Sequence, residues 1–413
     1  MDIEIITIGD EIVTGHVVDT NSTYLAHQLS EAGFFVRYMS SVGDSIEGME
    51  EAFRLALKRA QIVITTGGLG PTDDDLTKRA IVKVFRRNLV FHEDVLEQLK
   101  ERFRHRGVEM PAINQNQALL PQGARFFPNK YGSAVGICLA EEGRIFISLP
   151  GVPMEMKQIV SDEVIPYLRG LRTGHTLAIR KLRTTGIVES KLAELITGTI
   201  KLDSSVRLAY LPSFSGVDLR VMATGGTEVE AADKARTVER QLAEVCAKYL
   251  YGREHDTLEG VVGQLLKSDK CTLAVAESCT GGQLGMTITS VSGSSEYFKG
   301  GVIAYANDVK SAQLGVSEEL IRAHGAVSEE CAIAMASGVR KLLDSDYALS
   351  ITGVAGPDGG TDDKPVGLVY IGLASSKNCY ARKFRFGAER ASTRTRAVYA
   401  SLELLRRELL QIE

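Results

Sequence analysis

Apolar and polar residues alternate along the first part of the chain with two different periods. Short apolar runs fit buried strands, and the segments between them repeat apolar residues at helical spacing. Strands are predicted at 3–8, 35–42 and 61–66, and helices at 20–32, 46–59, 77–85 and 92–106. A glycine-rich, hairpin-like stretch at 129–148 and a helix from Pro153 would close this region near Leu168. Strands that alternate with helices are typical of an α/β domain with a mainly parallel sheet.

The pattern changes twice after this region. Residues 171–252 predict a small α+β domain, with strands at 176–184, 206–212 and 217–224 and helices at 189–199 and 228–250. Residues 253–413 predict a compact α/β sandwich. Its expected strands are 273–276, 302–304, 347–352, 367–375 and 379–385, and its helices are 257–268, 329–343 and 388–410. A chain of 413 residues is too long for one core, so we expect three domains, 1–168, 171–252 and 253–413.

Composition narrows the kinds of molecule that we expect the protein to bind. The net charge of −4 gives no electrostatic reason to expect binding to nucleic acid or to an anionic membrane. No apolar run approaches the ~20 residues that span a bilayer, and the chain starts directly with a strand pattern rather than a signal peptide. Six scattered cysteines contain no C-x-x-C pair, which argues against a zinc or redox motif and suits a reducing cytoplasm.

The richest chemical motif is V-A-E-S-C-T-G-G at 275–282. It places Ser278 between a short strand and a turn with two glycines, where backbone N–H groups near Thr280, Gly281 and Gly282 would stabilise an oxyanion. A serine needs a base, and Lys310 with a pKa lowered by burial would supply it, with Tyr305 relaying the proton. The neighbouring Cys279 is the alternative nucleophile, although a free cysteine is most often a small buried hydrophobic residue.

A second motif, I-T-T-G-G-L-G-P-T-D-D-D-L-T at 64–77, follows a predicted strand. Glycines let backbone N–H groups close on a phosphate, and carboxylates beside that phosphate suit a divalent cation. Asp73, Asp74 and Asp75 have a simpler alternative role, which is to cap the helix that begins at Thr77. The glycine-rich loop makes capping insufficient to explain all three.

Together these motifs resemble the CinA family over essentially the full chain. The matching segments are A-E-S-C-T-G-G at 276–282, A-Y-A-N-D-V-K at 304–310, T-G-V-A-G-P-D-G-G at 352–360 and K-P-V-G at 364–367. In the N-terminal region they are G-D-E-I-V-T-G at 9–15, D-T-N at 19–21, the glycine-rich loop with its aspartates, and L-P-G-V-P at 149–153. The N-terminal set is similar to the molybdopterin-binding domain of molybdenum-cofactor synthesis proteins, and the middle region to a KH-like domain.

For the C-terminal domain the resemblance implies a nicotinamide mononucleotide deamidase that needs no cofactor. It implies Ser278 as nucleophile, activated by Tyr305 and Lys310. Substrate contacts are expected from Thr280, Gly281, Gly282, Thr352, Gly353, Gly356 and Arg390. Arg390 has an equally simple alternative as an exposed helix arginine.

For the N-terminal domain the resemblance implies an ADP-ribose pyrophosphatase that uses Mg²⁺, Mn²⁺ or Co²⁺. The expected metal ligands are Asp74, Asp75, Asp44 and Glu11. The expected substrate contacts are Asn21, Gly67, Gly68, Gly70, Thr72, Thr77, Asn129, Gly132 and Ser133.

Two other functions compete with this pair of hydrolase activities. The N-terminal domain alone would also fit a molybdenum-cofactor adenylyl or molybdotransferase, which leaves Ser278 and Lys310 unexplained. A competence or recombination accessory role would require contact with DNA. The strand–helix junction T-T-G-I-V-E-S-K at 184–191 lacks the G-x-x-G loop with which KH domains clamp nucleic acid. We therefore expect the middle domain to be a spacer or dimerisation element of a homodimer.

Overall fold

The structure is a computed structural model, and it describes residues 2–72, 75–105, 107–171 and 176–412. The chain divides into two compact units, residues 1–177 and 178–413, which are treated separately below. The second unit holds both the predicted middle domain and the predicted C-terminal domain.

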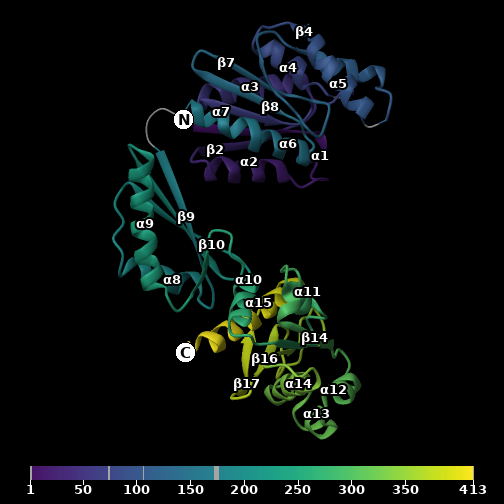
Figure 1. Ribbon diagram of the computed structural model, residues 1–413, viewed down its shortest axis with the longest axis vertical. Coiled ribbons are helices and arrows are strands. Elements are labelled where there is room, and N and C mark those ends of the chain that lie inside the picture. Colours follow the sequence, from purple (N-terminus) through teal and green to yellow (C-terminus); the bar gives the residue numbers. More distant parts are fainter. Residues whose placement is uncertain (1, 73–74, 106, 172–175, 413) are drawn as a thin grey trace. The chain divides into compact units, whose positions relative to one another are not determined.

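The first unit is built on a six-stranded sheet with strand order β2-β1-β3-β8-β7-β6 (Figure 1). The strands β1 (Asp2–Ile8), β2 (Phe35–Val42), β3 (Ile62–Thr66) and β8 (Arg144–Leu149) run parallel, and β7 (Gly136–Glu141) and β6 (Arg125–Phe127) add antiparallel pairs. The strand β1 is buried on both faces, because Ile3 and Ile5 enter one core while Ile6 and Ile8 enter the other. This confirms the predicted α/β class.

The helices of the first unit cover both faces of that sheet. They are α1 (Asp10–Val13), α2 (Thr20–Glu31), α3 (Ile46–Arg59), α4 (Thr77–Val84), α5 (Glu93–His105), α6 (Pro153–Ile159) and α7 (Ile165–Gly170). One core joins the sheet to α2 and α6, and the other joins it to α3, α4 and α5. The sequence reading missed a two-stranded sheet, β4 (Leu89–Phe91) with β5 (Leu119–Pro121), and the short helix η1 (Ala112–Ala118). Both are too short to show a clear period.

The middle domain is a four-stranded sheet with strand order β10-β11-β9-β12, packed against two helices (Figure 1). Its elements are β9 (Thr176–Thr184), α8 (Glu189–Thr197), β10 (Val206–Pro212), β11 (Val217–Gly225), α9 (Glu228–Val245) and β12 (Leu250–Arg253). The helix predicted to run to residue 250 is wrong at its end. It stops at Val245, because the following residues pair with β9 as the edge strand β12.

The C-terminal domain is a five-stranded sheet with strand order β14-β13-β15-β16-β17 and a helical layer on each face (Figure 1). The strands are β13 (Leu273–Glu277), β14 (Phe298–Ile303), β15 (Tyr347–Gly353), β16 (Leu368–Ala374) and β17 (Cys379–Arg385). The helices are α10 (Leu258–Ser268), α11 (Gln283–Thr289), α12 (Asn307–Leu314), α13 (Glu318–His324), α14 (Glu329–Leu342) and α15 (Arg390–Leu410). One core packs α10, α11 and α15 on the sheet, and the other packs α12 and α14 on its opposite face.

The middle and C-terminal domains are joined through α15. The guanidinium group of Arg406 is almost fully buried, pairs with Glu403 at 2.7 Å, and donates to the backbone carbonyls of Lys248 (2.8 Å) and Leu250 (3.4 Å). A buried guanidinium group needs such partners to offset the loss of water. Arg406 therefore fixes the last helix onto the start of β12.

Candidate active sites

The nucleophile loop of the C-terminal domain is held by a buried carboxylate. Glu277 ends β13 and accepts the N–H groups of Gly282 (3.1 Å), Leu284 (3.0 Å) and Gly285 (2.8 Å) at the start of α11. The turn between them needs glycine, because Gly281 and Gly282 have φ angles of 57° and 94°. These contacts place Ser278 at the first position after the strand.

Ser278 and Lys310 meet as predicted. The Lys310 Nζ lies 3.2 Å from the Ser278 Oγ and also donates to the carbonyl oxygens of Ala304 (2.8 Å) and Tyr305 (3.2 Å). Lys310 is 1% exposed, and burial lowers its pKa below the ordinary 10.5. No carboxylate of the described chain pairs with it. A buried lysine amine held only by neutral acceptors is suited to losing its proton.

Cys279 lies beside Ser278 but in a different environment. Its thiol is buried, and burial raises its pKa to about 11. The thiolate is the reactive form of cysteine, so this environment keeps the group unreactive near neutral pH. The structure thus favours Ser278 over Cys279 as the nucleophile.

The oxyanion donors differ from those expected. The Gly281 N–H donates to the Ser278 carbonyl (3.1 Å), and the Gly282 N–H is taken by Glu277, so neither is available to a substrate. The N–H groups of Cys279 and Thr280 find no acceptor in the part of the chain that the structure describes. The expected role of Gly281 and Gly282 as donors is therefore wrong, and those glycines shape the turn instead.

Tyr305 and Arg390 form a second layer around the nucleophile. The Tyr305 side chain is 60% exposed, and its hydroxyl lies 3.2 Å from Arg390 Nη2 rather than against Ser278 or Lys310. Arg390 opens α15 and also donates from Nη1 to the Gly356 carbonyl at 2.8 Å. Arg390 thus joins the Tyr305 segment to the loop at 353–360. The alternative role as an exposed helix arginine does not explain these two contacts. The expected proton relay through the Tyr305 hydroxyl has no support in this geometry.

Two other expected contacts have structural roles in this state. The Thr352 hydroxyl is buried and donates to the Ala326 carbonyl at 2.7 Å. Gly353 lies so close to β16 that a Cβ atom there would lie 2.6 Å from the Leu368 carbonyl oxygen. Both residues therefore shape the loop that carries Gly356.

Arg394 was missed by the sequence reading. It lies one helical turn after Arg390 on α15, and its Nη2 donates to the Thr280 carbonyl at 2.6 Å. Its Nε and the Thr280 hydroxyl are both buried without a hydrogen-bond partner among the described residues. The i, i+4 spacing from Arg390 was the available signal, because such residues share one helix face.

In the N-terminal domain the glycine-rich loop lies at the carboxyl ends of parallel strands, where ligands bind in open α/β sheets. Gly67 and Gly68 have φ angles of 118° and 63°, and a Cβ on Gly67 would lie 2.2 Å from the Ile8 carbonyl oxygen. Thr77 begins α4, and its hydroxyl donates to the Gly67 carbonyl at 3.0 Å. The predicted loop thus exists and requires its glycines, while the Thr77 hydroxyl serves the loop itself.

Asp75 is the one aspartate of the D-D-D motif at 73–75 that the structure describes. The Asp75 carboxylate accepts from the Gly70 N–H (2.7 Å), the Thr72 N–H (3.0 Å) and the Thr72 hydroxyl (2.5 Å). This closes the loop, in agreement with the alternative that at least one aspartate is structural. The Asp73 and Asp74 predictions lie outside the described residues.

The other expected ligands, Asp44 and Glu11, lie at or just before the start of helices of the first unit. The Asp44 carboxylate accepts the Asp10 N–H at 2.9 Å, while Glu11 lies in the short helix α1 beside Gly9. Across residues 2–72, 75–105, 107–171 and 176–412, no group of three or more His, Cys, Asp or Glu side chains could hold a metal ion. The described residues therefore do not by themselves form a metal site, and the metal requirement stays a prediction.

The buried side-chain amides of Asn21 and Asn129 differ in whether all of their polar atoms have hydrogen-bond partners. The Asn21 Nδ2 donates to the Thr66 hydroxyl (3.1 Å) and the Gly151 carbonyl (2.7 Å), but its Oδ1 is buried without a partner among the described residues. All polar atoms of Asn129 are engaged by its own loop, which includes Gly132, and by Glu155. Asn21 thus keeps an unused acceptor at the sheet edge, whereas Asn129 shapes the loop before the half-buried Ser133.

Lys78 was also missed. It follows Thr77 on α4, is buried, and donates from Nζ to the Asn116 carbonyl (2.7 Å) and to Gln117 Oε1 (3.3 Å). Burial lowers its pKa to about 8, and the nearby Asp75 charge opposes that change. Gln117 in turn donates to the Leu69 carbonyl at 2.9 Å, so η1 braces the glycine-rich loop.

Fold and sites define a class: a protein with an α/β domain that carries a glycine-rich loop, a KH-like domain, and an α/β domain with a buried serine–lysine pair. Three family descriptions match consecutive segments: a probable molybdopterin binding domain at 4–170, the KH domain of damage-inducible protein CinA at 179–252, and the CinA C-terminal domain at 255–409. The chain belongs to the CinA family.

Full-length relatives support this assignment. A CinA-like protein of Nostoc punctiforme is 43% identical over 99% of this chain and 100% of its own length. A CinA-like protein of Kosmotoga olearia is 40% identical over 100% of both chains.

Among solved structures, the CinA protein of Thermoplasma acidophilum is 33% identical over 40% of this chain and 97% of its own, with a TM-score of 0.37. The molybdopterin biosynthesis enzyme MoaB of Thermus thermophilus is 21% identical over 41% of this chain and 92% of its own, with a TM-score of 0.29. No helix among the described residues is both long and apolar enough to span a membrane.

Proposed function

We propose that the C-terminal domain is a serine amidohydrolase that converts nicotinamide mononucleotide to nicotinate mononucleotide and ammonia. The observation that carries the proposal is the contact between Ser278 Oγ and Lys310 Nζ at 3.2 Å, in a buried environment that lowers the lysine pKa. A neutral amine at that distance can take the hydroxyl proton as the oxygen attacks.

The steps follow from these groups. Lys310 accepts the Ser278 proton while Oγ bonds to the carboxamide carbon, and the N–H groups of Cys279 and Thr280 stabilise the oxyanion. The protonated Lys310 then gives its proton to the departing nitrogen, which leaves as ammonia and an acyl-enzyme remains. Water, deprotonated by the same amine, releases the carboxylate and restores Ser278.

Substrate orientation is assigned to the second layer of the site. The guanidinium group of Arg390 lies between the Tyr305 hydroxyl and the Gly356 carbonyl, at the mouth of the 353–360 loop. A guanidinium group is the preferred partner of a phosphate. We assign the nucleotide phosphate to Arg390 and the loop, with Tyr305 beside it rather than in the proton path.

We also propose that the N-terminal domain hydrolyses the pyrophosphate of ADP-ribose. The glycine-rich loop and the buried Lys78 support a site for a phosphorylated ligand at the sheet edge, where the unused Asn21 Oδ1 can accept a hydrogen bond from a ligand hydroxyl. A Mg²⁺, Mn²⁺ or Co²⁺ requirement rests on Asp74 and Asp75, and no step is drawn through that ion. The molybdenum-cofactor alternative would share this loop but leaves the Ser278–Lys310 pair without a role.

One assay tests both proposals. Purified protein is incubated separately with nicotinamide mononucleotide and with ADP-ribose, each with divalent metal and with EDTA. Ammonia should form from the first substrate in every buffer, whereas AMP and ribose phosphate should form from the second only with metal. Absence of ammonia release would refute the deamidase assignment, and AMP release in EDTA would refute the metal requirement.

The assembly and the compartment are proposals as well. All six cysteines are free, including the exposed Cys379, which supports a reducing cytoplasm. We propose a homodimer, which light scattering of the purified chain would test.

A further inference from the structure

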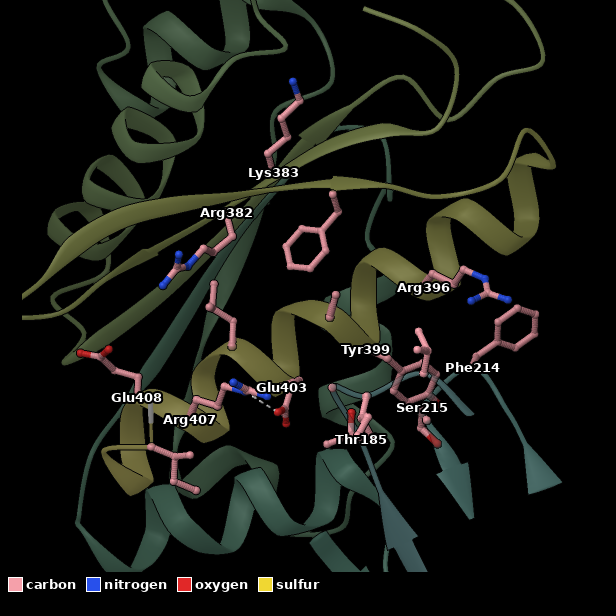
Figure 2. Close-up of a pocket in the computed structure, with 18 of the residues that line it drawn as sticks. Thr185, Phe214, Ser215, Arg382, Lys383, Arg396, Tyr399, Glu403, Arg407 and Glu408 are labelled. Atoms are coloured by element: carbon pink, nitrogen blue, oxygen red, sulfur yellow. Dashed lines mark hydrogen bonds and ion pairs between the residues drawn. The ribbon is translucent and has the colours of Figure 1, made fainter. Parts of the chain in front are cut away.

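A cavity of about 1220 Å³ lies between the middle and C-terminal domains, outside both candidate active sites (Figure 2). The middle domain contributes the segment after β9, residues 185–189, and the turn between β10 and β11, residues 212–217. The C-terminal domain contributes β17 and the second half of α15. Cavities at domain boundaries are common ligand sites, and typical ligand pockets measure about 300–1,000 Å³.

The lining is rich in aromatic rings. Phe384 in β17 and Phe386 just after it are stacked, with ring centroids 5.6 Å apart and planes 10° from parallel. Tyr399 from α15 and Tyr380 from β17 line the same space, and all four are only partly buried against the core. Half-exposed aromatic faces of this kind provide a surface on which a planar ring can stack.

Two arginines on opposite sides of the cavity lack acidic partners (Figure 2). The Arg382 guanidinium lies over the Tyr380 ring and that of Arg396 over the Phe214 ring, each 5.6 Å from the ring centroid. Among the described residues neither forms an ion pair, whereas the nearby Arg407 pairs with Glu403 at 2.7 Å. Both guanidinium groups therefore remain able to bind an anion.

The charge of the lining also favours an anion. Four basic side chains, those of Lys377, Arg382, Arg396 and Arg407, line the cavity against three acidic ones, although the whole chain has a net charge of −4. Two of the acids already have partners, since Glu403 accepts from Arg406 and Arg407, and Glu408 accepts from Asn378 and the Tyr380 hydroxyl. The third acid is Glu189, the first residue of α8.

We propose that this cavity binds a nucleotide, with the base stacked on the aromatic surface and the phosphates held by one of the two arginines, Arg382 or Arg396. A nucleotide combines a flat ring with an anionic group, the two features that this lining complements. Neither residue belongs to the proposed catalytic machinery, so the site stands independently of both hydrolase assignments.

The absence of tryptophan from the chain gives a direct test. Phe214 is 49% exposed at the tip of the β10–β11 turn, so Phe214→Trp places one fluorophore at the cavity with little disturbance. Full-length Phe214→Trp is titrated with ADP, adenosine and inorganic pyrophosphate. ADP should change the emission saturably, and adenosine and pyrophosphate should bind at least about tenfold more weakly because each supplies half of the contacts.

Charge variants in the same background decide the location. One of the two variants Arg382→Gln and Arg396→Gln should weaken ADP binding by about tenfold or more, and the other should change it little because the two arginines lie on opposite sides of the cavity. Arg385→Gln is the matched control, because Arg385 is on the same strand, points to the opposite face and does not line the cavity. Unchanged ADP affinity in both variants, or no saturable response, would overturn the proposal. Affinity for single-stranded oligonucleotides that increases with length and exceeds that for ADP would also overturn it, in favour of a nucleic-acid surface.

Discussion

The two candidate active sites differ in how much of their chemistry the polypeptide itself supplies. In the C-terminal site the nucleophile and its base are in contact, Ser278 Oγ to Lys310 Nζ at 3.2 Å, and a buried carboxylate fixes the loop that carries Ser278. In the N-terminal site the polar groups mostly serve the loop itself, as Asp75 does for Gly70 and Thr72. The contacts of the first site fit the covalent catalysis proposed for it, whereas the described polar groups of the second site are mostly engaged within its own loop.

The largest expected effect separates the sites through the nucleophile. Ser278→Ala should lower deamidation of nicotinamide mononucleotide by about 10⁴-fold or more and leave ADP-ribose cleavage unchanged, because the only reacting atom lost is the Ser278 Oγ. Ammonia release and AMP release measured on the same sample check both halves. Cys279→Ala is the matched control and should keep most of the activity. An inactive Cys279→Ala together with an active Ser278→Ala would reverse the assignment.

The next effect concerns the base. Lys310→Arg should reduce deamidation by about 10²–10⁴-fold, as Lys310→Ala does, since a guanidinium does not lose its proton near neutral pH. In the wild type the neutral amine is active, so kcat/KM should rise with pH through a pKa below 10.5. Near-normal turnover by the arginine variant would contradict the role of Lys310 as base.

Stability gives an independent readout of the same lysine. The folded protein holds Lys310 with a lowered pKa, so the unfolded chain binds the proton more strongly. The free energy of unfolding should therefore rise with pH between that lowered pKa and 10.5. Lys310→Met should flatten this part of a urea-denaturation pH series.

A variant with the opposite selectivity tests the N-terminal site. Asp75→Asn removes the charge that closes the glycine-rich loop, and it should lower ADP-ribose cleavage by about 10²-fold and the free energy of unfolding by about 1–2 kcal/mol. Deamidation should not change, and EDTA should have the same selectivity. Loss of deamidation in either case would show that the two sites are not separate.

A smaller effect is expected at the substrate phosphate. Arg390→Ala should raise KM for nicotinamide mononucleotide about tenfold more than KM for nicotinamide riboside, which has no phosphate. Tyr305→Phe removes the hydroxyl near Arg390 but not the carbonyl that holds Lys310, so its kcat should fall only slightly. Equal changes for both substrates in Arg390→Ala would exclude Arg390 from the phosphate site.

The smallest effect concerns stability rather than chemistry. A fragment of residues 253–413 should fold and deamidate, but it lacks the carbonyls of Lys248 and Leu250 that hold Arg406. Its Tm by differential scanning fluorimetry should lie about 5 °C below that of a fragment of residues 178–413. An inert but folded short fragment would show that the middle domain contributes to the deamidase site.

The sequence predicted the parts of the sites that are encoded locally. A nucleophile after a strand, a lysine five residues after a tyrosine and a glycine-rich loop are all readable as segments. The Arg394 contact to Thr280 and the brace of Lys78 depend on elements far apart in the chain. The clamp of Glu277 on α11 is local in sequence, but it depends on the backbone course of the turn between them. The short helix α12 was also missed, and the end of α9 was misplaced because pairing of β12 with β9 overrides helix propensity.

The last helix, α15, connects the nucleophile loop, the cavity and the contact between the middle and C-terminal domains. Its first turns carry Arg390 and Arg394 near the nucleophile loop. Its later turns carry Arg396 and Glu403 at the cavity and Arg406 at the contact with the middle domain. Each residue of an α-helix advances the rotation by about 100°. Deleting one residue between Arg394 and Arg396 would therefore turn every later side chain away from its partner, whereas point substitutions on the exposed face would not. Among members of this family, we expect the amino-acid sequence of α15 to vary but its length to stay the same.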